Sequence, residues 1–287
     1  MIDKKYFCLY NLLYMSALII ILIIMLLLLF AVLCYCIMEI QVKQLPNGIP
    51  KIIYMCYKHK NVPKYTLDNW IKLNPEYKVK LYDNQDCIIF LRDHYGEEYV
   101  NIFNYIKDGP IKADFWRACI LYQFGGVYAD VDVEPLVSIN NFLEKNVTFM
   151  SCASHYSVNS VNPHFIISTP KNEVLKECID IYLEYYRMRK PYKYWTWSIC
   201  PIMKKVLCRK LKVNKIAEGI YFENGNKYQF IQEIFPTLKD LKSMKSKGMP
   251  VYGDYHDHYC KYGDVIVLKN RYAAYNDTPP DLHRNDK

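Results

Sequence analysis

The sequence has 287 residues, a formal net charge of +8 and a hydrophobic fraction of 52%. This length and apolar content exclude a disordered chain and predict one sizeable folded domain with an appendage. The positive charge is modest and its lysines and arginines are scattered. It could favour an anionic ligand or a membrane surface, but it gives little support for nucleic-acid binding.

The first element in chain order is an uncharged, apolar stretch from Leu12 to Met38. It exceeds the roughly 20 residues that an α-helix needs to cross a bilayer, so we predict one transmembrane helix at 12–38. A cleaved signal peptide is the alternative, although its apolar region is usually shorter. Lys4 and Lys5 precede the span, which by the positive-inside rule predicts a cytosolic amino terminus.

The predicted organisation is therefore that of a single-pass type II membrane protein. Residues 1–11 form the cytosolic tail, 39–50 a short stem, and 51–287 a folded domain that faces the lumen. The sequons at Asn146 and Asn276 fit this location, although such tripeptides are common by chance.

Eight cysteines lie after the predicted span, and none of them forms a C-x-x-C pair, which argues against a structural zinc site. In an oxidising lumen some could form disulfides, but several lie in apolar runs and could equally be buried thiols. The eight are Cys56, Cys87, Cys119, Cys152, Cys178, Cys200, Cys208 and Cys260.

Hydrophobic periodicity predicts alternating strands and helices through the first half of the domain. Such alternation is typical of an α/β fold, with a mainly parallel sheet flanked by helices, in which ligands bind at the carboxyl ends of the strands. We predict strands at 51–57, 77–82, 147–152 and 165–168, and helices at 63–73, 84–91, 97–107, 110–124 and 170–189. The aromatic segment 191–197 could stack on a sugar, although such clusters are more often core.

The helix at 110–124 begins with a proline suited to a first turn and ends before Gly125. Ile111, Phe115, Ala118 and Tyr122 fall on one helical stripe, which we expect to face the core.

Charged residues on and after this helix form the main candidate site. Asp114 and Arg117 lie three apart, close enough to act on one ligand. After the Gly125-Gly126 break, a short buried strand leads to Asp130 and Asp132, which strand alternation would place on the same side. Two such carboxylates repel unless a cation lies between them, and Mg²⁺ or Mn²⁺ would keep positions open for a diphosphate. An isolated D-x-D is more often a solvated turn, but this context favours a metal site.

The block from Lys112 to Leu136 resembles the signature of DXD-motif sugar transferases of glycosyltransferase family 32. That family includes yeast-type initiating α-mannosyltransferases and sphingolipid mannosyltransferases, and the block is also similar to the glucosylating domain of large clostridial toxins. The resemblance implies a GT-A type, Rossmann-like domain that binds a nucleotide-sugar and transfers a hexose with retention of configuration. It also implies an ER or Golgi location.

The resemblance further implies a role for four charged residues of the block and for one tyrosine. Asp132 would bind Mn²⁺ or Mg²⁺, and Asp130 would bridge to the metal and contact the ribose or the donor sugar. Asp114 and Arg117 would bind sugar hydroxyls and phosphate, and Tyr128 would pack near the sugar.

Segments outside the block carry the weaker parts of the resemblance. The strand that contains Ile53 and Tyr54 would open the nucleotide-binding sheet, where the family usually has His in place of this tyrosine. His256 or His258 could complete the metal shell, or both could be surface residues. Segment 198–201 falls near a family motif of the acceptor side.

The implied partners are a nucleotide-sugar donor, either GDP-mannose or a UDP-sugar, a glycan or glycolipid acceptor, and the membrane. One alternative is a catalytically inactive, membrane-anchored carbohydrate-binding protein. Another is a D-x-D aspartyl phosphotransferase, whose chemistry prefers a small residue where this chain has Glu134.

Overall fold

The computed structural model describes positions 15, 19, 20, 22–30, 48–154, 161–234 and 258–270. The chain divides into two compact units, Met1–Pro46 and Asn47–Lys287. In the first unit the described positions are helical and their large apolar side chains are exposed. None of the described helices is both long enough and apolar enough to cross a bilayer. Much of the predicted span lies outside the described residues, so it stays a prediction.

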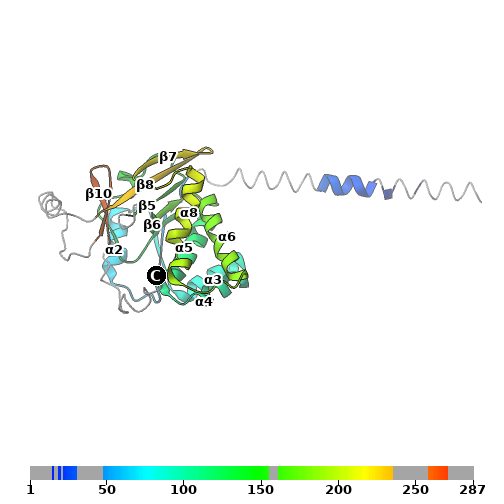
Figure 1. Ribbon diagram of the computed structural model, residues 1–287, viewed down its shortest axis with the longest axis horizontal. Helices are drawn as coiled ribbons and strands as arrows, with labels where there is room; N and C mark the ends of the chain where they lie inside the picture. Colours follow the sequence, from blue (N-terminus) through cyan, green and yellow to red (C-terminus); the bar gives the residue numbers. More distant parts are fainter. Residues whose placement is uncertain are drawn as a thin grey trace, which may run out of the picture. The chain divides into compact units, whose positions relative to one another are not determined.

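The second unit contains helices and strands in a mixed α/β arrangement (Figure 1). The strands are β1 (Ile52–Cys56), β2 (Lys78–Tyr82), β3 (Gly126–Ala129), β4 (Val133–Pro135), β5 (Phe149–Ala153), β6 (Val161–Ser168), β7 (Gly219–Glu223), β8 (Asn226–Ile234), β9 (His258–Tyr262) and β10 (Val265–Asn270). The helices are α2 (Lys64–Leu73), α3 (Asn84–Tyr95), α4 (Glu97–Tyr105), α5 (Gly109–Phe124), the 3-10 turn η1 (Ile139–Asn141), α6 (Glu173–Arg187), α7 (Tyr194–Trp197) and α8 (Ile199–Leu211).

The sheet has the strand order β2-β1-β3-β6-β5-β8-β9-β10-β4, with β7 paired to β8. The prediction of a mainly parallel sheet is wrong. Among the described strands, only the pairs β1–β2, β1–β3 and β5–β8 are parallel, and the other six pairs are antiparallel. Parallel neighbours need a long crossover, and helices provide it between β1, β2 and β3. Later strands are joined more directly, as at the tight turn Asn224-Gly225 between β7 and β8.

Two apolar clusters pack on opposite faces of the sheet. Strand alternation in β1 places Tyr54 in one cluster and Ile53 in the other. In Figure 1, α3, α4, α5, α6 and α8 gather on one side of the sheet and α2 lies on the other. The expectation of a sheet flanked by helices is thus confirmed, although the helices are distributed unequally.

Helix α5 is the central helix of the unit. It contacts α3, α4, α6, α8, β3 and β6. The predicted apolar stripe is only part of its buried surface, because nearly the whole circumference is covered, including Asp114 and Arg117. The fold therefore carries two charged side chains into its interior, where they must find polar partners.

The glycine pair after α5 allows the chain to turn directly into β3. Gly125 and Gly126 have φ angles of +65° and +103°. A Cβ atom on Gly125 would lie 2.6 Å from Cδ of Pro170, and one on Gly126 would lie 2.8 Å from the carbonyl oxygen of Ile52. The predicted glycine break is confirmed, and neither position has room for a side chain.

Candidate active site

The two aspartates of the D-x-D motif lie in the turn between β3 and β4. Strand β3 ends at Ala129 and β4 begins at Val133. The amide of Asp130 donates to the carbonyl of His164 (2.9 Å), and the amide of Val133 donates to the carbonyl of Asp130 (3.0 Å). The expectation that strand alternation sets the direction of both carboxylates is wrong, because the turn sets it.

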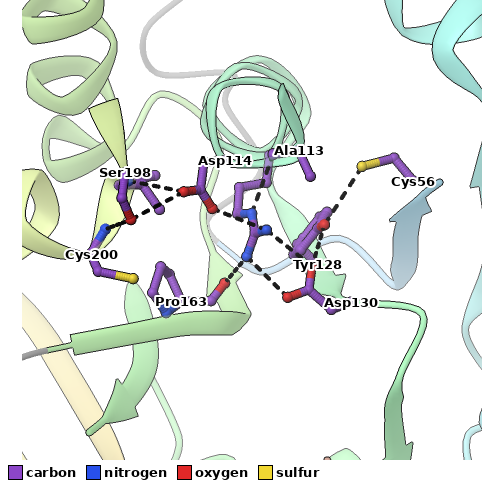
Figure 2. Close-up of polar contacts among 10 residues, drawn as sticks. Cys56, Ala113, Asp114, Tyr128, Asp130, Pro163, Ser198 and Cys200 are labelled. Atoms are coloured by element: carbon purple, nitrogen blue, oxygen red, sulfur yellow. Dashed lines mark hydrogen bonds and ion pairs between the residues drawn. The ribbon is translucent and has the colours of Figure 1, made fainter. Parts of the chain in front are cut away.

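Asp130 is bound by the guanidinium group of Arg117 from helix α5 (Figure 2). Nη2 of Arg117 lies 3.0 Å from Oδ1 of Asp130, and Nη1 lies 3.4 Å from Oδ2. Each carboxylate oxygen thus faces its own nitrogen, which is the two-point geometry that a planar guanidinium favours. The first carboxylate of the motif is therefore positioned by the protein itself.

The remaining N–H groups of Arg117 also face protein acceptors. Nε donates to the carbonyl of Ala113 (3.3 Å), Nη1 donates to that of Pro163 (2.6 Å), and Nη2 pairs with Oδ1 of Asp114 (3.1 Å). The side chain is only 4% exposed. The predicted contact between Arg117 and a phosphate would need one of these bonds to open, so this geometry favours a positioning role for Arg117.

Tyr128 completes the support of Asp130. Its hydroxyl donates to Oδ1 of Asp130 (2.6 Å), and its ring centroid lies 4.4 Å from Cζ of Arg117. Burial raises the pKa of Tyr128 well above its usual value, so the hydroxyl keeps its proton at neutral pH. Sγ of Cys56 lies 3.6 Å from the same hydroxyl. Tyr128 is fully buried, and in this structure it packs on Arg117 and not in an open pocket.

Asp114 connects this network to the start of helix α8. Its Oδ2 accepts from the amide of Ile199 (3.0 Å) and from the hydroxyl of Ser198 (3.4 Å), and that hydroxyl oxygen in turn caps α8 by accepting from the amide of Cys200 (3.3 Å) (Figure 2). Burial raises the pKa of Asp114 to about 6, against the opposing effects of Arg117 and the Ile199 amide. Segment 198–201 thus borders the candidate site, which its sequence position alone could not show.

Asp132 has a different environment from Asp130. It is half-buried and lines a small pocket with Glu134, Tyr65, Thr66 and Asn69. Burial, and next the charge of Asp130, raise the pKa of Asp132 to about 7. No cation within 4 Å of its carboxylate is found among the described residues.

The residues around the turn fit a hard divalent cation. Asp132 is a carboxylate destabilised by burial and by its acidic neighbour, which a bound cation would relieve. Carboxylate oxygens are the ligands that Mg²⁺ and Mn²⁺ prefer. Asp132 would be the direct ligand, because the negative charge of Asp130 is already balanced by the guanidinium group of Arg117.

The other predicted site residues lie apart from this pocket or outside the description. Ile53 and Tyr54 pair with Val127 and Tyr128 across β1 and β3, and both side chains are buried in the core. Because these side chains are buried, only the backbone atoms of Ile53 and Tyr54 could contact a nucleotide base unless the strand moved. His256 lies outside the described residues, and for His258 only the backbone, at the start of β9, is described.

Comparison with known proteins identifies the same region. Residues 61–149 match the family described as "Glycosyltransferase sugar-binding region containing DXD motif". A mannosyl phosphorylinositol ceramide synthase of Saccharomyces cerevisiae is 32% identical over 109 residues, which are 35% of this chain and 28% of that protein. An initiation-specific α-1,6-mannosyltransferase of Candida albicans is 27% identical over 106 residues, 34% of this chain and 28% of that protein.

A glycosyltransferase of Acanthamoeba polyphaga mimivirus, described as uncharacterized, is 32% identical over 101 residues, 33% of this chain and 40% of that protein. A solved PaToxG glycosyltransferase aligns with a TM-score of 0.45 and 16% identity over 57% of this chain and 70% of that chain, which is too low to assign the fold. The chain spans less than half the length of the curated relatives named above. The predicted resemblance to DXD-motif sugar transferases is confirmed, over a region that contains Asp114, Arg117, Tyr128, Asp130 and Asp132.

Proposed function

We propose that the chain is a metal-dependent, retaining hexosyltransferase of the GT-A type. It would move mannose, or else another hexose, from a nucleotide-sugar to a glycan or glycolipid acceptor. Mannose is favoured because several relatives are named mannosyltransferases. A glycolipid acceptor is favoured by the relatives named for inositol phosphoceramide and by the predicted membrane anchor at 12–38.

One observation carries this proposal: the two aspartates of the turn have complementary environments. Asp130 is fixed by Arg117 and Tyr128, whereas Asp132 lines a pocket without a described cationic partner. A solvated acidic turn would need no such support. The arrangement suits one carboxylate that orients a ligand and a neighbouring carboxylate that binds a metal ion.

The chemistry follows from the leaving group. Breaking the bond between a sugar and a nucleoside diphosphate builds negative charge on the phosphate, and a bound Mn²⁺ or Mg²⁺ would neutralise that charge. Asp130 would accept hydrogen bonds from ribose or sugar hydroxyls, since a carboxylate oxygen has more than one acceptor position. Arg117 and Tyr128 would keep its geometry fixed, so that little reorganisation is needed when the donor binds.

The acceptor side of the site would lie toward helix α8. Asp114 binds the first amide of α8 and the hydroxyl of Ser198, so movement of that helix start is coupled to the Asp114–Arg117–Asp130 network. Retention of configuration would require the acceptor hydroxyl to approach the face that the diphosphate leaves. The catalytic unit would face the lumen of the ER or Golgi.

The test is incubation of the purified chain with a panel of GDP- and UDP-sugars, with and without Mn²⁺. We expect turnover of one nucleotide-sugar, with transfer or slow hydrolysis, that requires the metal. Asp132→Asn should abolish it, whereas Asp93→Asn, an exposed change on helix α3, should not. Binding of a nucleotide-sugar without any turnover would instead support the carbohydrate-binding alternative.

A further inference from the structure

Three side chains far apart in the sequence meet within the sheet, next to the turn that carries Asp130 and Asp132. They are Cys152 on β5, His164 on β6 and Cys260 on β9. Sγ of Cys260 lies 3.3 Å from Sγ of Cys152 and 3.3 Å from Nε2 of His164. One potential ligand atom from each of the three residues lies within 4.8 Å of the other two. None of these side chains is more than 3% exposed.

The two cysteines lie on strands that are not neighbours in the sheet. Strand β8 lies between β5 and β9, with Ile231 opposite Cys152 and Glu233 opposite Cys260. Both cysteines are free thiols in this structure. Their sulfur atoms lie 3.3 Å apart, which is longer than the bond of about 2.05 Å in a disulfide. The two sulfur atoms are therefore close enough to bind one ion as separate ligands.

The imidazole ring of His164 faces the sulfur of Cys260 with Nε2, so Nε2 is the nitrogen that would bind a metal ion. Its Nδ1 is buried and has no hydrogen-bond partner among the described residues. A buried polar atom without a partner costs on the order of 1–3 kcal/mol, so such atoms usually mark a missing water, ion or ligand. This atom is the second ring nitrogen and not a ligand of the cluster, so the proposal rests on the three converging atoms Sγ of Cys152, Sγ of Cys260 and Nε2 of His164.

We propose that Cys152, His164 and Cys260 bind a transition-metal ion of the Zn²⁺ type. Two sulfur ligands and one imidazole are a donor set that zinc prefers, and three protein ligands leave the fourth position of a tetrahedral site to water or another small ligand. Binding would release the two thiol protons to solvent, and the two thiolates would balance the charge of the ion.

This site is distinct from the one at Asp132, which offers oxygen ligands to a hard cation. The location of the proposed metal site suggests that the ion would help to position Asp130 and Arg117. The carbonyl of His164 accepts from the amide of Asp130, and the carbonyl of Pro163 accepts from Nη1 of Arg117. A metal ion on His164 would therefore fix the part of β6 that holds both the acidic turn and the arginine that supports it.

The experiment measures metal content and does not depend on transferase activity. The full chain, purified in detergent without added metal or strong chelator, should carry about one equivalent of zinc by mass spectrometry. Cys152→Ser and Cys260→Ser should each lose it. The matched control is Cys178→Ser, a fully buried cysteine of α6 outside the cluster, which should retain it. Asp132→Asn should also retain it, which separates this proposal from the proposed function.

A second measurement on the unaltered chain covers the case in which the serine variants do not fold. Co²⁺ added to metal-free, reduced protein should give a thiolate-to-metal charge-transfer band, and Zn²⁺ should protect Cys152 and Cys260 from alkylation while Cys178 is unaffected. Reduced protein that takes up neither ion would overturn the proposal. So would peptide mapping that finds Cys152 and Cys260 joined in a disulfide.

Discussion

Arg117 binds Asp130 through both carboxylate oxygens, with Nη2–Oδ1 and Nη1–Oδ2 distances of 3.0 and 3.4 Å. The same guanidinium pairs with Asp114 on its own helix and lies against the ring of Tyr128. A single buried cation thus connects helix α5 to the turn that carries the D-x-D motif. The geometry of the first carboxylate is fixed before any ligand binds.

Arg117→Lys should lower both activity and stability, because an ammonium group cannot reproduce the two-point contact. We expect a loss of unfolding free energy on the order of 2 kcal/mol from the missing charge-assisted hydrogen bonds. Urea unfolding of the purified chain measures it. The matched control is Arg187→Lys, since Arg187 makes an equally two-pronged contact with Glu98 at the surface. There the loss should be much smaller, because the pair is exposed to solvent, and equal losses at both sites would contradict this interpretation.

Tyr128→Phe should reduce kcat by about tenfold or more, because the hydroxyl that orients Asp130 is removed while the ring on Arg117 remains. Steady-state kinetics with the best donor from the nucleotide-sugar panel tests this. Tyr182→Phe is a suitable control, since that buried hydroxyl has no partner among the described residues. If both variants keep full activity, the support of Asp130 is not needed for the reaction.

Asp132 should make stability depend on pH. Burial and the charge of Asp130 raise its pKa from 3.8 to about 7. Between these pH values the folded chain keeps a proton that the unfolded chain releases. The unfolding free energy therefore falls as pH rises through this range, by about 1.4 kcal/mol for each unit of pKa shift. In metal-free buffer, Asp132→Asn should be more stable than the unaltered chain at about pH 8.

The difference should vanish below about pH 4, where the carboxyl is protonated in both the folded and the unfolded chain. Unfolding free energies measured across this range for both proteins check the slope. Saturating Mn²⁺ should recover part of the loss for the unaltered chain only. Parallel pH curves for the two proteins would show that Asp132 titrates normally.

Much of the fold around the site could be predicted from local sequence. Helix α5, the glycine break and strand β3 follow from proline, glycine and apolar spacing, which act within a few residues. Strand alternation predicts Asp130 and Asp132 on the same side of one strand, and this prediction is wrong because β3 ends at Ala129 and a turn carries both residues. The six antiparallel strand pairs do not follow from local sequence, since short connections say little about which distant strands will pair.

The polar partners at the site depend on contacts between residues far apart in the chain. Asp114 meets Ser198 across 84 positions, and Cys152 meets Cys260 across 108. No local pattern encodes such pairs. The absence of a C-x-x-C motif argued against a zinc site, yet ligands from three separate strands need no such spacing. The burial of Arg117 likewise depends on the elements that cover nearly the whole circumference of α5.

Gly125→Ala and Gly126→Ala should each destabilise the chain by about 1–3 kcal/mol or more, because both residues have positive φ angles and a Cβ atom would overlap with Pro170 or with the Ile52 carbonyl. Thermal unfolding measures the effect as a lower Tm. Gly109→Ala is the control, since its φ angle is not positive and nothing lies within 4 Å of its Cβ position. A Tm that is unchanged in the first two variants would mean that the turn can be rebuilt.

Isothermal titration calorimetry of Mn²⁺ in the presence of GDP or UDP tests whether Asp132 binds a divalent cation together with a nucleoside diphosphate. Mutation of residues that only hydrogen-bond to a metal ligand often lowers metal affinity about 10- to 100-fold. Loss of a direct ligand in Asp132→Asn should therefore lower Mn²⁺ affinity at least about 100-fold. We expect a nucleotide-dependent Mn²⁺ site in the unaltered chain and in Asp93→Asn, but not in Asp132→Asn. Equal Mn²⁺ affinity in all three proteins would contradict it.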